Sequence, residues 1–306
     1  MKGWRIVKIT LACVLAAANV FMLGFLHSVF RPMEYIPEDA IRQMRELLRK
    51  DGIVIPQGVV DGQKIDLPIY EGAMTQDYYT VTASKLSRSG VSLTFDAPNG
   101  IVVSMTNGAR CALYDGFGIR YTAPNAPEHH VLSSLDVSAL LPLPPADVET
   151  VREVIDVFLD GASSSNSAFP YTVVTCAEDT ENGIRYCVCE QEMGGSPLMG
   201  FRTVFAVQNA KVIGMSGSWC FASIGAAYSA QLLDQINILY SVRNRILEER
   251  ESTADEWVEI VSLDLGYAVY FRGDTENFYL IPAWNVQTDA GENYCINAVD
   301  GTLYTK

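Results

Sequence analysis

The chain has 306 residues, of which 49% are hydrophobic, so it can form one large domain or several smaller ones with buried cores. Its formal net charge is −14, and the charge is uneven: residues 1–50 carry +4, whereas residues 51–306 carry −18. An acidic body of this kind argues against binding to nucleic acid or to an anionic membrane surface.

The longest apolar stretch of the chain lies at residues 9–30. Its first part, Ile9–Leu26, contains 18 residues without a charge, which is long enough for a helix that crosses a bilayer. Basic residues at positions 2, 5 and 8 precede this stretch, and such residues keep the preceding segment in the cytoplasm. We therefore predict a cytoplasmic N-terminus at 1–8 and a single transmembrane helix at 9–30. The protein is expected in the cell membrane, with its main part outside the cell.

A cleaved signal peptide is the alternative. The small residues Ala16-Ala17-Ala18 lie in the middle of the apolar stretch, whereas a cleavage site follows such a stretch. The residues after Leu26, His27-Ser28-Val29-Phe30, also make a poor cleavage site. An uncleaved anchor fits the sequence better.

One face of the expected transmembrane helix carries small residues around a polar centre. Ala12, Ala16, Asn19 and Leu23 follow the spacing of one helix face. A side-chain amide in lipid is costly unless it is paired, so these four residues form the candidate interface with a partner helix. The alternative is an Asn19 amide that bonds to its own backbone.

Residues 31–142 are predicted to form a first extracytoplasmic α+β lobe, with one helix and an antiparallel sheet. Pro37-Glu38-Asp39 opens the helix, because proline and acidic residues favour a helix N-terminus, and Gly52 ends it. The strands predicted after it include Tyr78–Thr82, Val91–Phe95 and Ile101–Met105. Five prolines between residues 124 and 145 indicate a connection to the next lobe.

Residues 143–306 are predicted to form a second α+β lobe, in which a helix followed by four strands occurs twice. The two units span about 143–222 and 223–306, with helices at Ala146–Leu159 and Ala227–Glu249. The predicted strands are Tyr171–Ala177, Ile184–Glu190, Phe201–Val207, Lys211–Trp219, Trp257–Leu265, Tyr267–Phe271, Tyr279–Val286 and Tyr294–Ala298. Strands grouped after helices indicate an α+β fold, in which antiparallel sheets are each packed by a helix.

Six of the seven cysteines lie outside the anchor, where disulfides are permitted. Asn182-Gly183 separates two predicted strands and favours a two-residue type I′ turn. That turn would place Cys176 opposite Cys189 with their Cα atoms about 4.5 Å apart, a spacing that a disulfide tolerates. Two alternatives stay open: a three-residue loop would set Cys176 against Val188, and buried free thiols would need no partner.

The sequence contains no recognisable catalytic or cofactor motif. It lacks G-x-S-x-G, H-E-x-x-H, a P-loop and G-x-G-x-x-G. His129-His130 lies in the proline-rich connection, with no cysteine and no H-x-x-x-H spacing nearby. Cys187-Val188-Cys189 lacks the further ligands of a zinc site. We therefore predict that the protein is not an enzyme and holds no cofactor or metal.

Several segments, taken in their order along the chain, resemble one known family. Ala18-Asn19-Val20-Phe21-Met22-Leu23 lies in the anchor, and Leu47-Leu48-Arg49-Lys50-Asp51-Gly52-Ile53 ends the first helix. Near the C-terminus follow Leu265-Gly266-Tyr267, then Leu280-Ile281-Pro282-Ala283-Trp284-Asn285-Val286, then Tyr294-Cys295-Ile296-Asn297-Ala298-Val299-Asp300-Gly301. In this order of parts the chain resembles the YycH/YycI family, and YycI most closely.

The resemblance implies a regulator of signal transduction. It implies a single-pass membrane protein of a Gram-positive bacterium that associates with WalK, the sensor histidine kinase of the WalK–WalR two-component system that controls cell-wall metabolism. The expected partners are such a kinase and a paralogous YycH-like protein. Two other functions stay open: an extracytoplasmic binding module for a small molecule or cell-wall fragment, and a cell-wall hydrolase with an acidic pair that the sequence does not single out.

Overall fold

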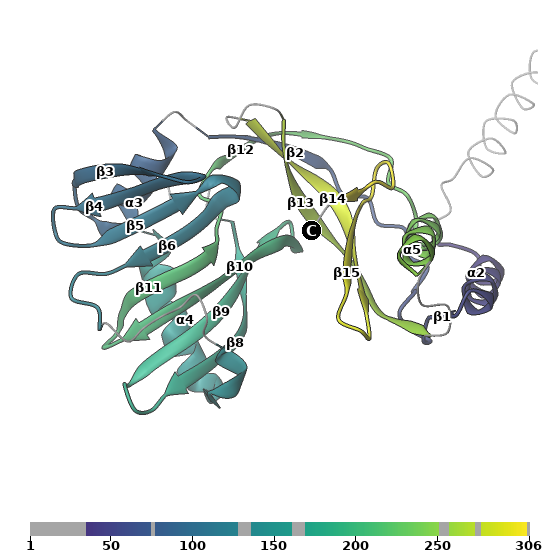
Figure 1. The fold of residues 1–306 in the computed structure, drawn as a ribbon, viewed down its shortest axis with the longest axis horizontal. Coiled ribbons are helices and arrows are strands. Elements are labelled where there is room, and N and C mark those ends of the chain that lie inside the picture. The colour runs from purple at the N-terminus through teal and green to yellow at the C-terminus, as the bar shows by residue number, and fades with distance from the viewer. Residues whose placement is uncertain are drawn as a thin grey trace, which may run out of the picture.

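The structure, a computed structural model, describes residues 35–74, 77–127, 136–160, 169–250, 257–272 and 277–304. The predicted anchor at 9–30, with Ala12, Ala16, Asn19 and Leu23, lies outside these ranges, as does the His129-His130 pair. Within them, no helix combines the length and the apolar character that a membrane span requires. The described part is mixed α and β, with a curled and mainly antiparallel sheet (Figure 1).

Four α-helices and one 16-stranded sheet make up the described part of the chain. The helices are α2 (Glu38–Lys50), α3 (Tyr78–Ser87), α4 (Pro145–Asp160) and α5 (Gln235–Glu249). Short 3-10 helices lie at Asp115–Phe117 and Val137–Ala139. The strands are β1 (Ile53–Val54), β2 (Ile69–Ala73), β3 (Val91–Ala97), β4 (Gly100–Met105), β5 (Arg110–Tyr114), β6 (Gly118–Thr122), β7 (Leu141–Pro142), β8 (Tyr171–Asp179), β9 (Ile184–Met193), β10 (Ser196–Gln208), β11 (Lys211–Ser218), β12 (Ser223–Tyr228), β13 (Val258–Phe271), β14 (Asn277–Thr288), β15 (Asn293–Asn297) and β16 (Leu303–Tyr304).

The first core lies between the helices α3 and α4 and the strands β4–β6 and β8–β11. Helix α4 is amphipathic, with Val151, Ile155 and Leu159 recurring every four residues on its buried side. These side chains pack in one cluster with sheet residues such as Phe205 and Met215, both fully buried. The hydrophobic spacing of the helix thus fixes which of its sides covers the sheet.

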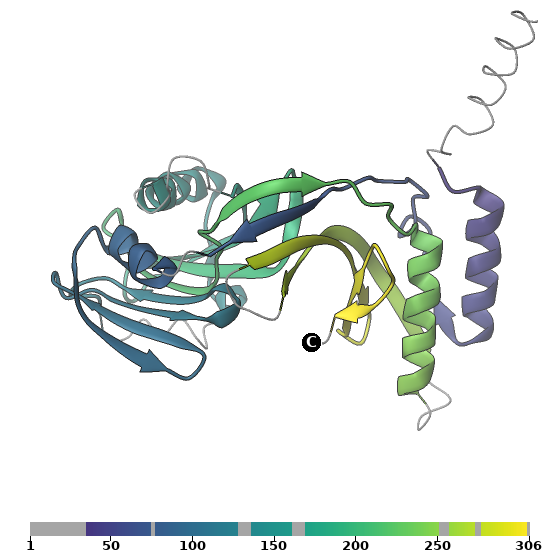
Figure 2. The same ribbon diagram turned by 90° about the horizontal axis from the view of Figure 1, so that it is seen from above.

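The second core lies under α2 and α5, which run side by side over β13–β15 (Figure 2). Leu48 and Ile53, from the N-terminal part of the chain, pack there with Ile238, Ile246 and Trp284. Segments far apart in sequence therefore build this core. The lobe boundary predicted at 142/143 does not coincide with the two cores, since β6 also pairs with β11 across it.

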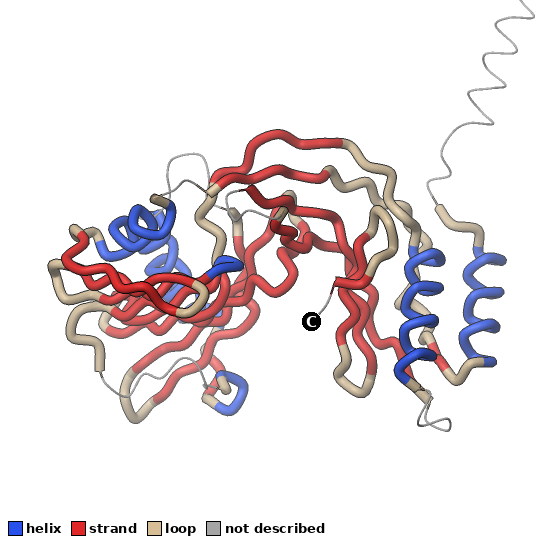
Figure 3. Tube along the Cα trace, turned by 45° about the horizontal axis from the view of Figure 1, so that its top comes forward, coloured by secondary structure: helices blue, strands red, loops and turns tan. Residues whose placement is uncertain are grey.

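A third cluster joins the two cores where the sheet bends (Figure 3). The ring centroid of Phe117 lies 4.9 Å from that of Phe278 and 5.7 Å from that of Phe201. Strand β10 belongs to both parts, because it pairs with β9 and β11 on one side and meets β13 at Leu198 and Tyr267 on the other. The strands thus form one continuous sheet, which corrects the prediction of separate sheets.

The predicted helices at Pro37 and Ala146 are confirmed as α2 and α4, but Tyr78–Thr82 is not a strand. This segment begins α3, in which Tyr78, Thr82 and Leu86 recur every four residues on the buried side. Burial of that side outweighs the preference of tyrosine and threonine for strands, because propensity is a weak influence beside tertiary packing.

Helix α5 begins later than predicted, at Gln235, because residues 223–228 form β12. The two predicted strands Trp257–Leu265 and Tyr267–Phe271 are one strand, β13. Three of the four strands after α5 cover predicted strands, and the fourth, β16, was not predicted; five strands, β8–β12, follow α4 where four were predicted.

Candidate functional site

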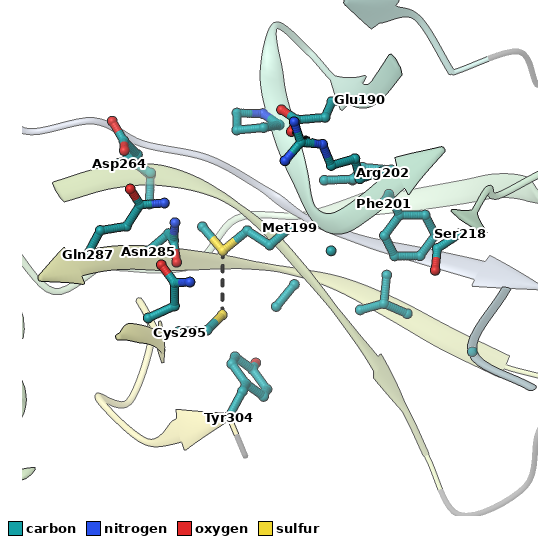
Figure 4. A pocket seen from close by; sticks show the side chains of 18 of the residues that line it. Glu190, Met199, Phe201, Arg202, Ser218, Asp264, Asn285, Gln287, Cys295 and Tyr304 are labelled. Atoms are coloured by element: carbon teal, nitrogen blue, oxygen red, sulfur yellow. Dashed lines mark hydrogen bonds and ion pairs between the residues drawn. The ribbon is translucent and has the colours of Figure 1, made fainter. Parts of the chain in front are cut away.

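A cleft of about 1090 Å³ lies between β10 and the strands β13–β16 (Figure 4). We take it as the candidate functional site, because ligand sites in proteins are concave and combine apolar surface with a few polar groups. The side chains used below line two walls: Asp264, Asn285, Gln287, Asn293, Cys295 and Tyr304 on β13–β16, and Glu190, Met199, Phe201 and Arg202 on β9 and β10.

The wall formed by β13–β16 presents polar side chains in two rows, because facing residues in an antiparallel sheet share one side. In the first row, Asp264 faces Asn285, Asn285 faces Cys295, and Cys295 faces Tyr304. In the second row, Ser262 faces Gln287, which faces Asn293. Along β14 the alternate residues Trp284 and Val286 lie in the second core. The alternation of the strand therefore separates amides on the cleft side from apolar residues on the core side.

The polar groups of this wall have unused hydrogen-bonding capacity. Within the described part of the chain, the side chains of Asn285, Gln287 and Asn293 make no hydrogen bond. The hydroxyl groups of Ser262 and Tyr304 are buried and have no partner there either. The two buried hydroxyl groups are costly in this state. Gln287 and Asn293 are exposed and Asn285 is partly buried, so solvent can complete the hydrogen bonds of these amides when no ligand is bound.

Burial keeps two groups at the lower end of the cleft neutral. Burial, and after it the neighbouring Cys295, raises the pKa of the Tyr304 hydroxyl above its ordinary value of 10.0. Burial also raises the pKa of the Cys295 thiol to about 11. This thiol donates a hydrogen bond to the sulfur of Met199 at 3.4 Å (Figure 4). Because the thiolate is the reactive form of cysteine, Cys295 is a polar contact group here and not an activated nucleophile.

Strands β9 and β10 form the opposite wall. The Nε atom of Arg202 lies 3.7 Å from Oε1 of Glu190, and both side chains are partly exposed. The register between β9 and β10 shifts between Pro197 and Arg202. Gly200 lies within this irregular stretch with φ of +79°, a left-handed conformation that favours glycine. The resulting bend holds Met199 over the cleft, opposite Cys295 (Figure 4).

The predicted pairing of Cys176 with Cys189 is wrong. Cys176 faces Cys187 across the β8–β9 hairpin, and these two residues form a disulfide with Cα atoms 4.2 Å apart. Cys189 faces Val173 and is a buried free thiol. The alternative register, with Cys176 against Val188, is wrong as well.

The hairpin loop explains the error. The last facing pair is Asp179 with Ile184, so the loop has four residues and not two. The Asp179 carboxylate accepts hydrogen bonds from the backbone N–H of Glu181 at 3.0 Å and of Asn182 at 3.3 Å. The Asn182 side chain also donates to it, and these bonds lower the pKa of Asp179 below its ordinary value of 3.8. An aspartate-capped loop therefore replaces the type I′ turn and moves the register by two residues.

Sequence reasoning did not single out the residues of the cleft. A signal is present in Ala283-Trp284-Asn285-Val286-Gln287, where amides alternate with apolar residues. This alternation places two amides on one side of a strand, but it does not reveal that β10 crosses over that side. In the described ranges, the cleft included, no group of three or more His, Cys, Asp or Glu side chains is arranged to hold a metal ion.

Comparison with known proteins gives a likeness of fold. No family model matches the chain, and no curated protein matches it. A crystal structure of an uncharacterized protein from Eubacterium rectale is similar, with a TM-score of 0.52 over 89% of this chain and 99% of that chain. The two sequences are 11% identical, so the likeness shows a shared fold and nothing about function.

Proposed function

We propose that the protein is a non-enzymatic, single-pass membrane regulator that binds and modulates a sensor histidine kinase of the WalK type. The observation that carries this proposal is where the residues resembling YycI lie in space. Three separate sequence segments, at Leu265-Gly266-Tyr267, Pro282–Trp284 and Ile296–Ala298, occupy adjacent strands or strand ends.

Residues of these segments face one another directly. Leu265 faces Trp284, Trp284 faces Ile296, and Tyr267 faces Pro282. A resemblance that was read from scattered positions therefore corresponds to one connected piece of the sheet. The proposal therefore rests on the resemblance of this one piece of the sheet.

The second core also connects this piece of sheet to the segment that follows the predicted anchor. Helix α2 begins at Glu38, shortly after residue 30, where the predicted anchor ends. Its C-terminal end is held to α5 by an ion pair in which Arg243 Nε lies 2.6 Å from Asp51 Oδ2. The cleft-forming sheet is thus packed on the helix that follows the predicted anchor in the sequence, an arrangement that would suit a regulator using both an anchor and an extracytoplasmic part.

The alternative function is an extracytoplasmic binding module. The cleft favours it, because its lining combines apolar side chains with polar ones, among them the buried Tyr304 hydroxyl, which has no partner in the described chain. The two functions are compatible, since a regulator can respond to a ligand.

The kinase interaction can be tested by a bacterial two-hybrid assay with the full chain and the sensor kinase. We expect the double variant Ala16→Leu, Asn19→Leu to weaken association, because interhelical polar contacts contribute about 0.6–2 kcal/mol, or roughly threefold to thirtyfold. Ala18→Leu makes the same kind of change on another side of the helix and should leave the signal unchanged. Equal signals from all three chains would contradict the proposed interface, and no signal with the unaltered chain would contradict the partner.

A further inference from the structure

The hydrogen-bonding groups of the cleft are mostly neutral and are arranged as an array. Asn285 and Gln287 lie two residues apart on β14, and Asn293 faces Gln287 from β15. Each of these amides carries both donors and acceptors in one plane, and none is used within the described chain. Figure 4 shows Asn285 and Gln287 beside Asp264, all on the same wall.

From this array we infer that the cleft binds a neutral oligosaccharide. Neighbouring hydroxyl groups on a sugar ring each donate and accept hydrogen bonds, so a pair of them matches the donor and acceptor of one planar amide. The inference does not depend on the kinase interaction; it rests on the alternative function, a binding module, and gives that module a class of ligand.

The charges of the cleft argue against an anionic ligand. Arg202 is the only cationic side chain among the described residues that line it, and Glu190 lies 3.7 Å from its Nε atom. Asp264 lies on the other wall without an ion-pair partner in the described chain. An anionic ligand would lose hydration without gaining a free cation, whereas sugar hydroxyl groups can donate to the Asp264 carboxylate.

The geometry of the wall argues against an extended peptide. Peptides that bind to sheets commonly add a strand to an exposed edge, where main-chain groups are free. Here β14 pairs with β13 on one side and with β15 on the other, and alternate side chains of these strands face the cleft. The wall therefore offers side-chain amides rather than main-chain groups.

The size and apolar part of the cleft suit a ligand of several sugar rings. Its volume of about 1090 Å³ lies just above the range of about 300–1,000 Å³ for ligand pockets. Met199, Val269 and Phe271 contribute apolar surface to the same lining. Such surface can pack against the C–H faces of sugar rings while the amides bind the hydroxyl groups.

The experiment is a calorimetric titration of the full chain, held in micelles of a detergent without a sugar headgroup. The probes are the tetrasaccharides of N-acetylglucosamine, glucose in β-1,4 linkage and glucose in α-1,4 linkage, with an uncharged, end-blocked tetra-alanine peptide as comparison. We expect at least one tetrasaccharide to bind. Gln287→Ala and Asn285→Ala should each weaken its binding about tenfold, because each removes one or two hydrogen bonds.

Gln43→Ala is the matched control, because Gln43 is an exposed amide on α2, a helix that contributes no residue to the lining of the cleft. It should leave binding unchanged. The inference is overturned if no tetrasaccharide binds, if only the peptide binds, or if Gln287→Ala and Asn285→Ala bind the saccharide as tightly as Gln43→Ala. Circular dichroism spectra identical to that of the unaltered chain will show that each variant is folded.

Discussion

At the scale of single residues, one glycine sets how closely β10 approaches β13. A Cβ atom on Gly266 would lie 2.5 Å from the carbonyl oxygen of Pro197 and 3.2 Å from Cε of Met199. Contacts this short are not tolerated, so any larger residue would push the β10 segment away from the sheet. The middle residue of Leu265-Gly266-Tyr267 therefore shapes the cleft without lying on its surface as a binding group.

Gly266→Ala should lower the free energy of unfolding by about 1–3 kcal/mol, because the added methyl group meets backbone that cannot move without breaking strand contacts. Gly225→Ala is the control: its Cβ would lie 3.4 Å from the Glu71 carbonyl oxygen, an ordinary contact, so a change within about 0.5 kcal/mol is expected. Urea unfolding of the full chain in micelles, followed by circular dichroism, measures both. Equal unfolding midpoints for the two variants would show that β10 tolerates the displacement.

At the scale of elements, the sequence predicts those whose own residues determine them. Helices α2 and α4 are predicted because proline and acidic residues open them and an apolar face recurs along them. Helix α3 is missed because its strand-favouring residues become helical through packing of Tyr78 and Leu86 against other segments. The β8–β9 hairpin is predicted, but its register is not, because an aspartate carboxylate caps the loop. Local pattern thus identifies elements, while side-chain contacts decide their type and register in such cases.

The hairpin register predicts which cysteines are linked. In the described part of the chain, Cys176 and Cys187 are bonded and four further cysteines are free thiols. Counting Cys13 of the predicted anchor as a fifth thiol, we expect the oxidised chain to show five free thiols when it is denatured without reductant. Cys189→Ala should keep the bond and show four free thiols. Cys187→Ala should show six, because Cys176 then faces no thiol. Loss of the bond should also lower the free energy of unfolding by about 2–3 kcal/mol, given the separation of 11 residues between its ends.

Thiol titration with a chromogenic disulfide reagent distinguishes the two pairings. Four free thiols in Cys187→Ala and six in Cys189→Ala would instead restore the register with Cys176 opposite Cys189. The free-energy change is measured by comparing urea unfolding of Cys187→Ala with that of Cys189→Ala, which removes a buried thiol of the same core but no disulfide.

At the scale of the whole molecule, order along the chain and order in space differ. The N-terminal residues Leu48 and Ile53 share the second core with residues 238–298. The intervening part of the chain forms the first core, whose buried residues lie between positions 83 and 219. The sheet order β12-β2-β14-β13-β10-β11-β6 shows the same interleaving. Hydrophobic periodicity carries no information on which strands lie side by side over such distances, so neither the lobe boundary nor the cleft between β10 and β13–β16 could be predicted. The sequence shows that amides alternate with apolar residues in what becomes the cleft wall, but it does not show where in the fold that wall lies.

The topology of the whole chain in the membrane follows from its charges and is the broadest prediction. The basic residues at positions 2, 5 and 8 should hold the N-terminus in the cytoplasm, so that the acidic residues 51–306 lie outside. Alkaline phosphatase fused after residue 306 should be active, because it folds only outside the cytoplasm. Green fluorescent protein fused at the same position should be dark, because it does not become fluorescent when it is exported through the general secretory route. The fusion must also retain its first residues, since the anchor is expected to stay uncleaved.

Replacing Lys2, Arg5 and Lys8 together by glutamine is the matched variant. It removes the charge that orients the anchor and keeps the apolar stretch, so phosphatase activity per molecule should fall. Replacing Lys50, Lys64 and Lys85 by glutamine removes the same charge from the outer part and should leave the activity high, because charge far from the membrane span contributes little to orientation. N-terminal sequencing of the mature protein gives the independent check: a chain that begins after residue 26 would show that the apolar stretch is a signal peptide, and the interface at Ala12, Ala16, Asn19 and Leu23 would fall with the anchor.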